Sequence, residues 1–121
     1  MLALPFAVTA LGDGVGDPVI VLPGGPCRGP EYLGDFAGVG DVRPLIDLHP
    51  RGTQRSGGLS RGWWVDASDV ILLADALGLS SFDVIAHSAG TRLALATAAQ
   101  FTSRVGSMAL ITPPASWLSG T

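Results

Sequence analysis

Apolar positions along this chain gather in short runs that glycine and proline separate. Five of these runs are rich in aliphatic or β-branched residues and predict strands, at residues 6–11, 19–22, 41–48, 82–86 and 105–111. The second run is apolar at every position, which is typical of a strand that is buried on both faces of a sheet. The pattern therefore predicts a sheet whose central part is covered from both sides.

Two segments have the spacing of helices. Residues 66–77 place apolar side chains on one side at intervals of three and four, and Gly78 follows as a stop signal. The alanine- and leucine-rich segment 91–99 comes directly after the fourth predicted strand. Because strands that alternate with helices are typical of the α/β class, we expect a single domain over residues 1–121. Its sheet should be mostly parallel, with helices on both faces.

Charged residues make up only 14% of the chain, and its mean hydropathy is +0.43. Ordinary soluble domains carry about 25% charged residues. No run approaches the ~18 apolar residues that a membrane-spanning helix needs. Two explanations remain open, and both can hold: the chain is dominated by buried parallel strands and close-packed helices, or another chain covers part of its apolar surface.

The charge pattern excludes several classes of partner. The net charge is −3, the isoelectric point is near 5.0, and the seven basic residues are scattered arginines, so neither nucleic acid nor a membrane surface is expected. Cys27 is the single cysteine, which excludes an internal disulfide and suits a reducing compartment, so we expect a cytoplasmic protein. Met1–Ala10 lacks the basic start of a signal peptide. We expect no metal site and no cofactor.

The residues that could carry chemistry follow the predicted strands. Residues 23–26, residues 49–56 and the turn around Ser88 each come directly after an apolar run. In parallel sheets, binding and catalytic groups gather outside the carboxyl ends of the strands. The three segments are therefore expected to lie at one edge of the sheet.

The segment Ala86-His87-Ser88-Ala89-Gly90 has the form of a nucleophile elbow, G-x-S-x-G, with alanine at the first position. In such an elbow a strained turn between strand and helix lifts the serine hydroxyl above the sheet. The positions two before and two after the serine must be small because the strand and helix backbones approach closely. The alternative interpretation is an ordinary tight connection between a strand and a helix.

Together these segments resemble the α/β-hydrolase superfamily, and within it the prolyl iminopeptidases, over about residues 12–117. The segment from Pro23 to Cys27 resembles that family's His-Gly-Gly-Pro-Gly loop. The segment from Pro50 to Ser56 resembles its Asp-x-Arg-Gly-x-Gly-x-Ser loop, and the segment around Ser88 resembles its elbow. The three matches occur in the family's order. Pro23, Cys27, His49 and Gln54 depart from the family pattern.

The resemblance implies a role for each matching residue. Ser88 would be the nucleophile, and the backbone N–H groups of Gly25 and Ala89 would form the oxyanion hole. Arg51 would hold loops together beside the site rather than bind substrate. Gly24, Gly52 and Gly90 would support those loops.

The other members of a serine hydrolase triad are missing. Such enzymes place an aspartate or glutamate and then a histidine after the serine, but residues 89–121 contain none of these. His87 lies within the elbow, where neighbouring side chains diverge, so His49 is the remaining candidate base. We therefore expect the N-terminal half of an α/β-hydrolase core, without the cap and the last strands. A C-terminal hydrolase chain would supply the aspartate, the histidine and the cap.

Several functions remain open on this basis. The resemblance implies an aminopeptidase that acts through an acyl-enzyme on peptides with N-terminal proline, or on a related small amide or ester. An esterase or thioesterase is equally compatible with the chemistry. A truncated, catalytically inactive hydrolase that acts as a binding module is the alternative from another class. Dehalogenases and epoxide hydrolases are disfavoured because they need a carboxylate where Ser88 stands.

Overall fold

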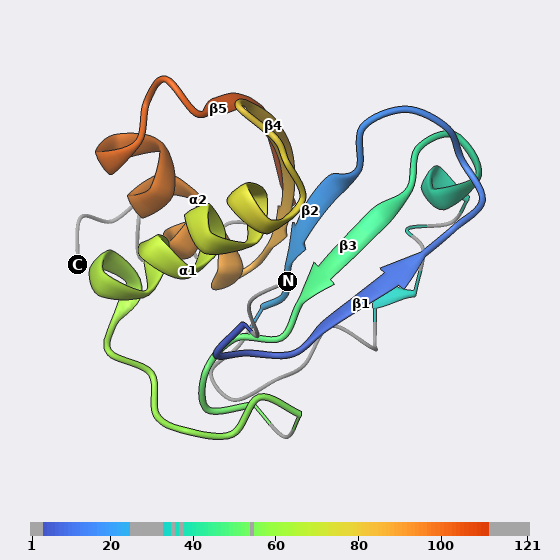
Figure 1. Cartoon of the computed structure of the whole chain (residues 1–121). Coiled ribbons are helices and arrows are strands. Elements are labelled where there is room, and N and C mark those ends of the chain that lie inside the picture. Colours follow the sequence, from blue (N-terminus) through green and yellow to red (C-terminus); the bar gives the residue numbers. More distant parts are fainter. Residues whose placement is uncertain (1–3, 25–32, 35, 37, 54, 112–121) are drawn as a thin grey trace.

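The computed structural model describes residues 4–24, 33–34, 36, 38–53 and 55–111. Five strands form one sheet (Figure 1): β1 (Val8–Leu11), β2 (Val19–Leu22), β3 (Leu45–Leu48), β4 (Phe82–His87) and β5 (Val105–Ile111). Their order across the sheet is β1-β3-β2-β4-β5. β1 runs antiparallel to β3, and the other neighbours are parallel. The prediction of a mostly parallel α/β sheet is confirmed.

The two α-helices, α1 (Trp63–Ala76) and α2 (Gly90–Gln100), lie side by side against the same face of the sheet (Figure 1). We call this the first face. Its sheet residues and the helices share one apolar cluster, which includes Ile20, Leu22, Val84, Val70, Leu73 and Leu93. Successive strand residues alternate between faces, so the opposite residues of the same strands point to a second face.

The second face has a different cover. Its buried cluster consists of Val19, Val21 and Leu45, with Ile85 and Phe36 among the partly buried residues packed against it. The 3₁₀ helix η2 (Val39–Asp41) lies on this side. We expected helices on both faces, but both α-helices within the described residues lie on the first. Residues 25–32, which include part of the predicted oxyanion loop, lie outside the described residues.

Two element boundaries differ from the sequence prediction for identifiable reasons. β3 begins at Leu45 rather than at residue 41, because η2 occupies the start of that segment and Pro44 cannot donate to the sheet. α1 begins at Trp63, three residues before the predicted start at Asp66. The Asp66 carboxylate accepts hydrogen bonds from the Ser60 hydroxyl at 2.8 Å and from the Arg61 backbone N–H. Asp66 therefore lies within the first turn of α1 and holds the preceding segment against it.

Candidate active site

Ser88 lies in the two-residue turn between β4 and α2, with a backbone φ of 51°. Such left-handed values are rare for residues with a side chain, and they are characteristic of functional turns. The Ser88 N–H donates to the carbonyl of Ile111 at 2.8 Å. The Ser88 carbonyl accepts from the Thr91 N–H at 3.0 Å and from the Thr91 hydroxyl at 2.6 Å. The turn is therefore fixed both by the end of β5 and by the first turn of α2.

Two glycines allow the segment after β2 to lie directly against this turn. A Cβ on Gly90 would come within 2.3 Å of the carbonyl oxygen of Pro23. A Cβ on Gly24 would come within 2.9 Å of the Ser88 Cβ and 2.8 Å of the His87 carbonyl oxygen. Real Cβ contacts are not this short, so these positions require glycine. By contrast, Ala86 is fully buried in the first-face cluster, where its methyl group is accommodated.

The proposed oxyanion-hole residues are only partly covered by the structure. Gly25 lies outside the described residues. Ala89 is the N-cap of α2, directly after Ser88. The first N–H groups of a helix have no partner within it and favour negative charge nearby. Gly24, the last described residue before Gly25, lies against Ser88.

Arg51 binds α1. Its Nε and Nη2 donate to the two carboxylate oxygens of Asp69 at 2.7 and 3.0 Å. This hydrogen-bonded pair raises the pKa of the Arg51 guanidinium above its usual value. Arg61 donates to the same carboxylate at 3.1 Å. Gly52 adopts a φ of 89°, and its N–H donates to the Gly57 carbonyl at 2.8 Å. These contacts fix the loop after β3 to the start of α1.

A cavity of about 210 Å³ lies beside this loop. It is lined by residues from four segments, among them Pro23, Arg51, Trp63 and Leu93. Pro23 adjoins Gly90, so the cavity is close to the beginning of α2. Its lining is mostly apolar, which suits a hydrocarbon group better than a charged one.

His49 is placed away from the serine. Its side chain is buried, and its Nε2 lies 2.8 Å from the Thr9 hydroxyl on β1. In the sheet β3 separates β1 from β2, and β4 lies on the far side of β2. The contact of His49 is therefore directed away from the strand that carries Ser88, which disfavours it as a base. Within the described residues, no group of three potential metal ligands is found, and no helix has the length and apolarity to span a membrane.

Sequence reasoning missed two residues that shape this region. Thr91 fixes the turn through its hydroxyl, and Asp69 receives both Arg51 and Arg61. A threonine three residues after the elbow serine was a usable signal, because threonine hydroxyls often bond to a carbonyl one turn back. Asp69 gave no such signal, since its partners lie in a loop whose path the sequence does not reveal.

Comparison with known proteins identifies the family. The family model described as "alpha/beta hydrolase fold" matches residues 17–120. This chain therefore belongs to the alpha/beta hydrolase fold family, and the resemblance to that superfamily is confirmed.

Individual relatives show how much of such a protein is present. N-formylmaleamate deformylase of Pseudomonas putida is 37% identical over 73 residues, which are 60% of this chain and 27% of that protein. A marine microorganism esterase superposes with a TM-score of 0.78 at 21% identity, covering 89% of this chain and 41% of that one. A solved structure of AqDC, described as the structural basis for recognition and ring-cleavage of the Pseudomonas quinolone signal, superposes with a TM-score of 0.73 at 26% identity. The match covers 89% of this chain and 42% of that one. The chain thus spans about a quarter to two-fifths of these relatives.

Proposed function

We propose that this chain carries the nucleophile and the oxyanion hole of a serine hydrolase. The observation that carries the proposal is the strained backbone of Ser88 at the junction of β4 and α2, with Gly24 packed against it. Strain at a non-glycine residue costs free energy and persists where the surrounding structure imposes it. Here the contacts of Thr91 and Ile111 supply that constraint.

The proposed reaction proceeds through an acyl-enzyme. The Ser88 Oγ attacks a carbonyl carbon while a base takes its proton, and N–H groups of Gly25 and Ala89 stabilise the oxygen that becomes negative. The tetrahedral intermediate then expels an amine or alcohol, which takes the proton from the base. Water attacks the acyl-enzyme in the same way and releases the acid.

The base and its acidic partner would come from polypeptide outside residues 1–121. A serine hydroxyl without a base stays protonated and reacts slowly. We propose that a C-terminal hydrolase chain supplies an aspartate, a histidine and the cap. On this proposal the chain alone is nearly inactive, since an oxyanion hole without a triad retains only a small part of the catalysis.

The proposed substrate is a small amide or ester. One relative is named as a deformylase and a solved relative as an esterase, and both names fit attack by a serine on a carbonyl carbon. The narrower hypothesis of an aminopeptidase for N-terminal proline is supported by the loops around Gly24, Arg51 and Ser88 alone, and none of the relatives described above carries that name.

Labelling with a fluorophosphonate probe tests the proposed nucleophile. The chain is mixed with the part of N-formylmaleamate deformylase that follows the matched stretch, and labelling is measured by intact mass. We expect one label per chain, loss of labelling in Ser88→Ala, and unchanged labelling in Ser81→Ala, which removes an exposed hydroxyl. Any ester or amide hydrolysis should fall at least about 10³-fold in Ser88→Ala. Equal labelling of both variants, or none in the wild type, would favour the inactive binding module.

A further inference from the structure

The cavity of about 210 Å³ beside the loop after β3 has a buried inner end and an exposed mouth. The inner end is lined by Pro23 and Leu93, and both residues are buried. The mouth is lined by Leu59, which is 84% exposed, and by Ser60. Ser88 is not among the described residues that line the cavity. The mouth therefore lies on the surface loop and not at the serine.

The charged residues in the cavity wall are bound to other residues of the chain. Arg51 donates through Nε and Nη2 to the Asp69 carboxylate at 2.7 and 3.0 Å. The Asp66 carboxylate accepts from the Ser60 hydroxyl at 2.8 Å and from Arg61 Nε at 3.0 Å. A buried water needs about three polar partners, and a buried charge needs an opposite one. Because these side chains already bind one another, the cavity favours a neutral occupant over water or an ion.

The same contacts fix the walls of the cavity. The Arg51–Asp69 pair joins the loop to α1, and within the loop the Gly52 N–H donates to the Gly57 carbonyl at 2.8 Å. Protein interiors are close-packed and contain few voids larger than a water molecule. A void of this size persists here because its walls are held by contacts that do not depend on an occupant. The cavity is therefore preformed, as ligand sites usually are.

The apolar part of the wall suits a flat ring. Trp63 contributes an indole, Pro23 and Pro50 contribute pyrrolidine rings, and Leu59 and Leu93 contribute aliphatic side chains. Aromatic rings gain energy from stacked or edge-on contact with another aromatic ring. An apolar cavity of about 150 Å³ is large enough to hold benzene. The volume of about 210 Å³ leaves room for a benzene ring with a small substituent.

We propose that this cavity is a binding site for a small neutral molecule that contains one aromatic ring. The inference goes beyond the proposed function, because it requires neither the chemistry of Ser88 nor any polypeptide outside residues 1–121. It rests on three observations: the cavity is preformed, its charged groups are compensated, and its remaining lining is apolar and includes the indole of Trp63.

The first test compares the same substitution at two leucines of α2. Leu93→Phe places a phenyl ring at the inner end of the cavity, whereas Leu95→Phe changes a residue that does not line it and is 39% exposed. The probe is bromobenzene, and isothermal titration calorimetry measures its affinity for each chain. We expect Leu95→Phe to bind like the wild type and Leu93→Phe to bind at least about tenfold more weakly, since its own ring occupies the site. Leu93→Phe should keep the Tm of the wild type, because the added atoms enter an existing void.

A second test locates the probe without altering α2. A bromine atom quenches the fluorescence of a tryptophan that it contacts. Trp63 lines the cavity, whereas its neighbour Trp64 does not and is 60% exposed. Saturating bromobenzene should therefore quench Trp64→Phe as it quenches the wild type. Quenching should be lost in Trp63→Phe, although calorimetry still detects binding there, because phenylalanine keeps an aromatic wall.

Two further arms test the ligand class and the independence from the serine. Benzoate should bind at least about tenfold more weakly than bromobenzene, because its carboxylate would be buried without an available partner. Ser88→Ala should bind bromobenzene like the wild type, so that a failure of the proposed hydrolase would leave this result standing. The inference would be overturned by equal affinities of folded Leu93→Phe and the wild type, by equal affinities for benzoate and bromobenzene, by quenching that persists in Trp63→Phe, or by no binding to the folded wild type.

Discussion

The two faces of the sheet differ in how completely they are buried. On the first face, β2 and β4 pack against α1 and α2, and Ile20, Leu22 and Ala86 have no exposed surface. On the second face the fully covered part is limited to β2 and β3, and exposure rises toward β5. The same strands contribute to both faces. The two faces therefore differ in what covers them, and on β5 also in the size of their side chains.

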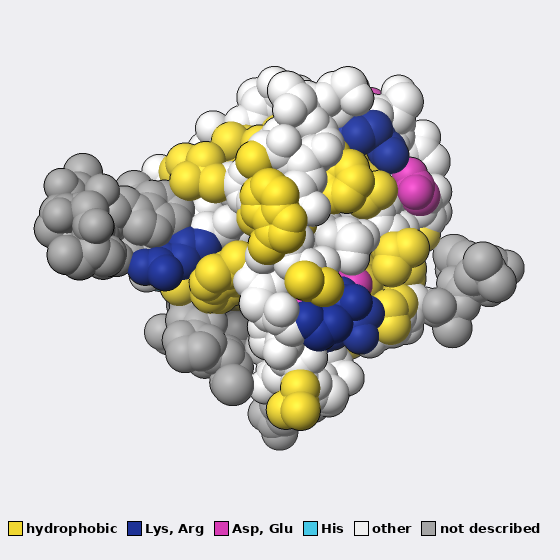
Figure 2. Space-filling view, turned by 90° about the vertical axis from the view of Figure 1, so that its left-hand side faces the viewer, with side chains coloured by type: hydrophobic (Ala, Val, Ile, Leu, Met, Phe, Trp, Pro, Cys, Tyr) yellow, Lys and Arg dark blue, Asp and Glu magenta, His cyan; other side chains and the backbone are white. Residues whose placement is uncertain are grey.

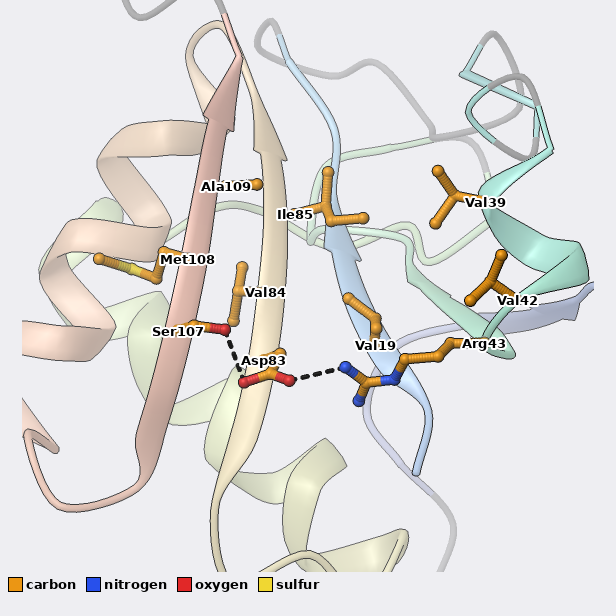
Figure 3. A pocket seen from close by; sticks show the side chains of 10 residues that line it. All are labelled: Val19, Val39, Val42, Arg43, Asp83, Val84, Ile85, Ser107, Met108 and Ala109. Carbon is orange, nitrogen blue, oxygen red and sulfur yellow. Dashed lines mark hydrogen bonds and ion pairs between the residues drawn. The ribbon is translucent and has the colours of Figure 1, made fainter. Parts of the chain in front are cut away.

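The helix-covered side also has an ordinary outer surface. Seen from the side of α1 and α2, apolar side chains form separate groups with polar surface between them (Figure 2). Scattered exposed apolar residues such as Leu72 and Leu95 are normal on a soluble protein. The second face differs because Val39, Val42 and Ile85 line one groove of about 280 Å³ (Figure 3).

The largest difference should appear when one apolar side chain is removed from each face. Leu73→Ala empties a site on α1 that is 1% exposed, and we expect it to lower the free energy of unfolding by about 2–5 kcal/mol. Ile85→Ala removes a partly buried side chain that lines the groove, and a loss of about 1 kcal/mol is expected, since solvent already reaches it. Urea denaturation followed by circular dichroism measures both values.

The substitutions Leu73→Ala and Ile85→Ala also show whether the second face is covered in a complex. In the presence of a bound partner chain, the effect of Ile85→Ala should increase toward that of Leu73→Ala, because the site becomes fully buried. Equal effects in the isolated chain would contradict the distinction between the faces.

Much of the architecture was accessible from the sequence because local and global signals agree. The run at Val19–Leu22 indicated a buried strand, and the small residues around Ser88 indicated a strand–turn–helix junction; both elements are present. The antiparallel β1 was not foreseen, since a short strand pattern carries no information on direction. Other features depend on contacts between distant segments, such as Arg51 with Asp69, 18 residues apart, or the groove between η2 and β5.

A smaller change in the free energy of unfolding is expected when an ion pair is removed, and its size should depend on how deeply the pair is buried. Asp69 accepts from Arg51 and Arg61 with its side chain 4% exposed, whereas Asp75 accepts from Arg104 with its side chain 58% exposed. Asp69→Asn should lower the free energy of unfolding by about 2–3 kcal/mol, because Arg51 loses its charged partner in a partly buried site and Arg61 keeps only Asp66. Asp75→Asn should cost less than about 1 kcal/mol. Thermal denaturation of the two variants in the same buffer gives the comparison, and similar losses would show that burial around α1 does not set the strength of these pairs.

The smallest effect is expected on the second face itself, at the polar end of the groove. Hydrogen bonds from Arg43 and then from Ser107 lower the pKa of Asp83 below its usual value, although about a third of its side chain is exposed. A carboxyl group whose pKa is lowered by folding stabilises the protein above its unfolded pKa of about 4 and loses this contribution as the pH falls through the folded value. Asp83→Asn should therefore cost at most about 1 kcal/mol at pH 7 and low salt, and less at pH 3, which lies below the unfolded pKa.

Urea midpoints at both pH values and at two salt concentrations measure this effect, with the exposed Asp13→Asn as the control. If Asp83→Asn lowered the free energy of unfolding equally at both pH values, the charge of Asp83 would not be the source of its contribution. The same measurement, made in a complex with a partner, tests whether that partner covers the groove beside Arg43 and Asp83. A partner that covers Ser107 and Ala109 would remove solvent from the Arg43–Asp83 pair, so the cost of Asp83→Asn should rise and its dependence on salt should fall. An unchanged salt dependence would place the partner elsewhere on the molecule and leave the second face open.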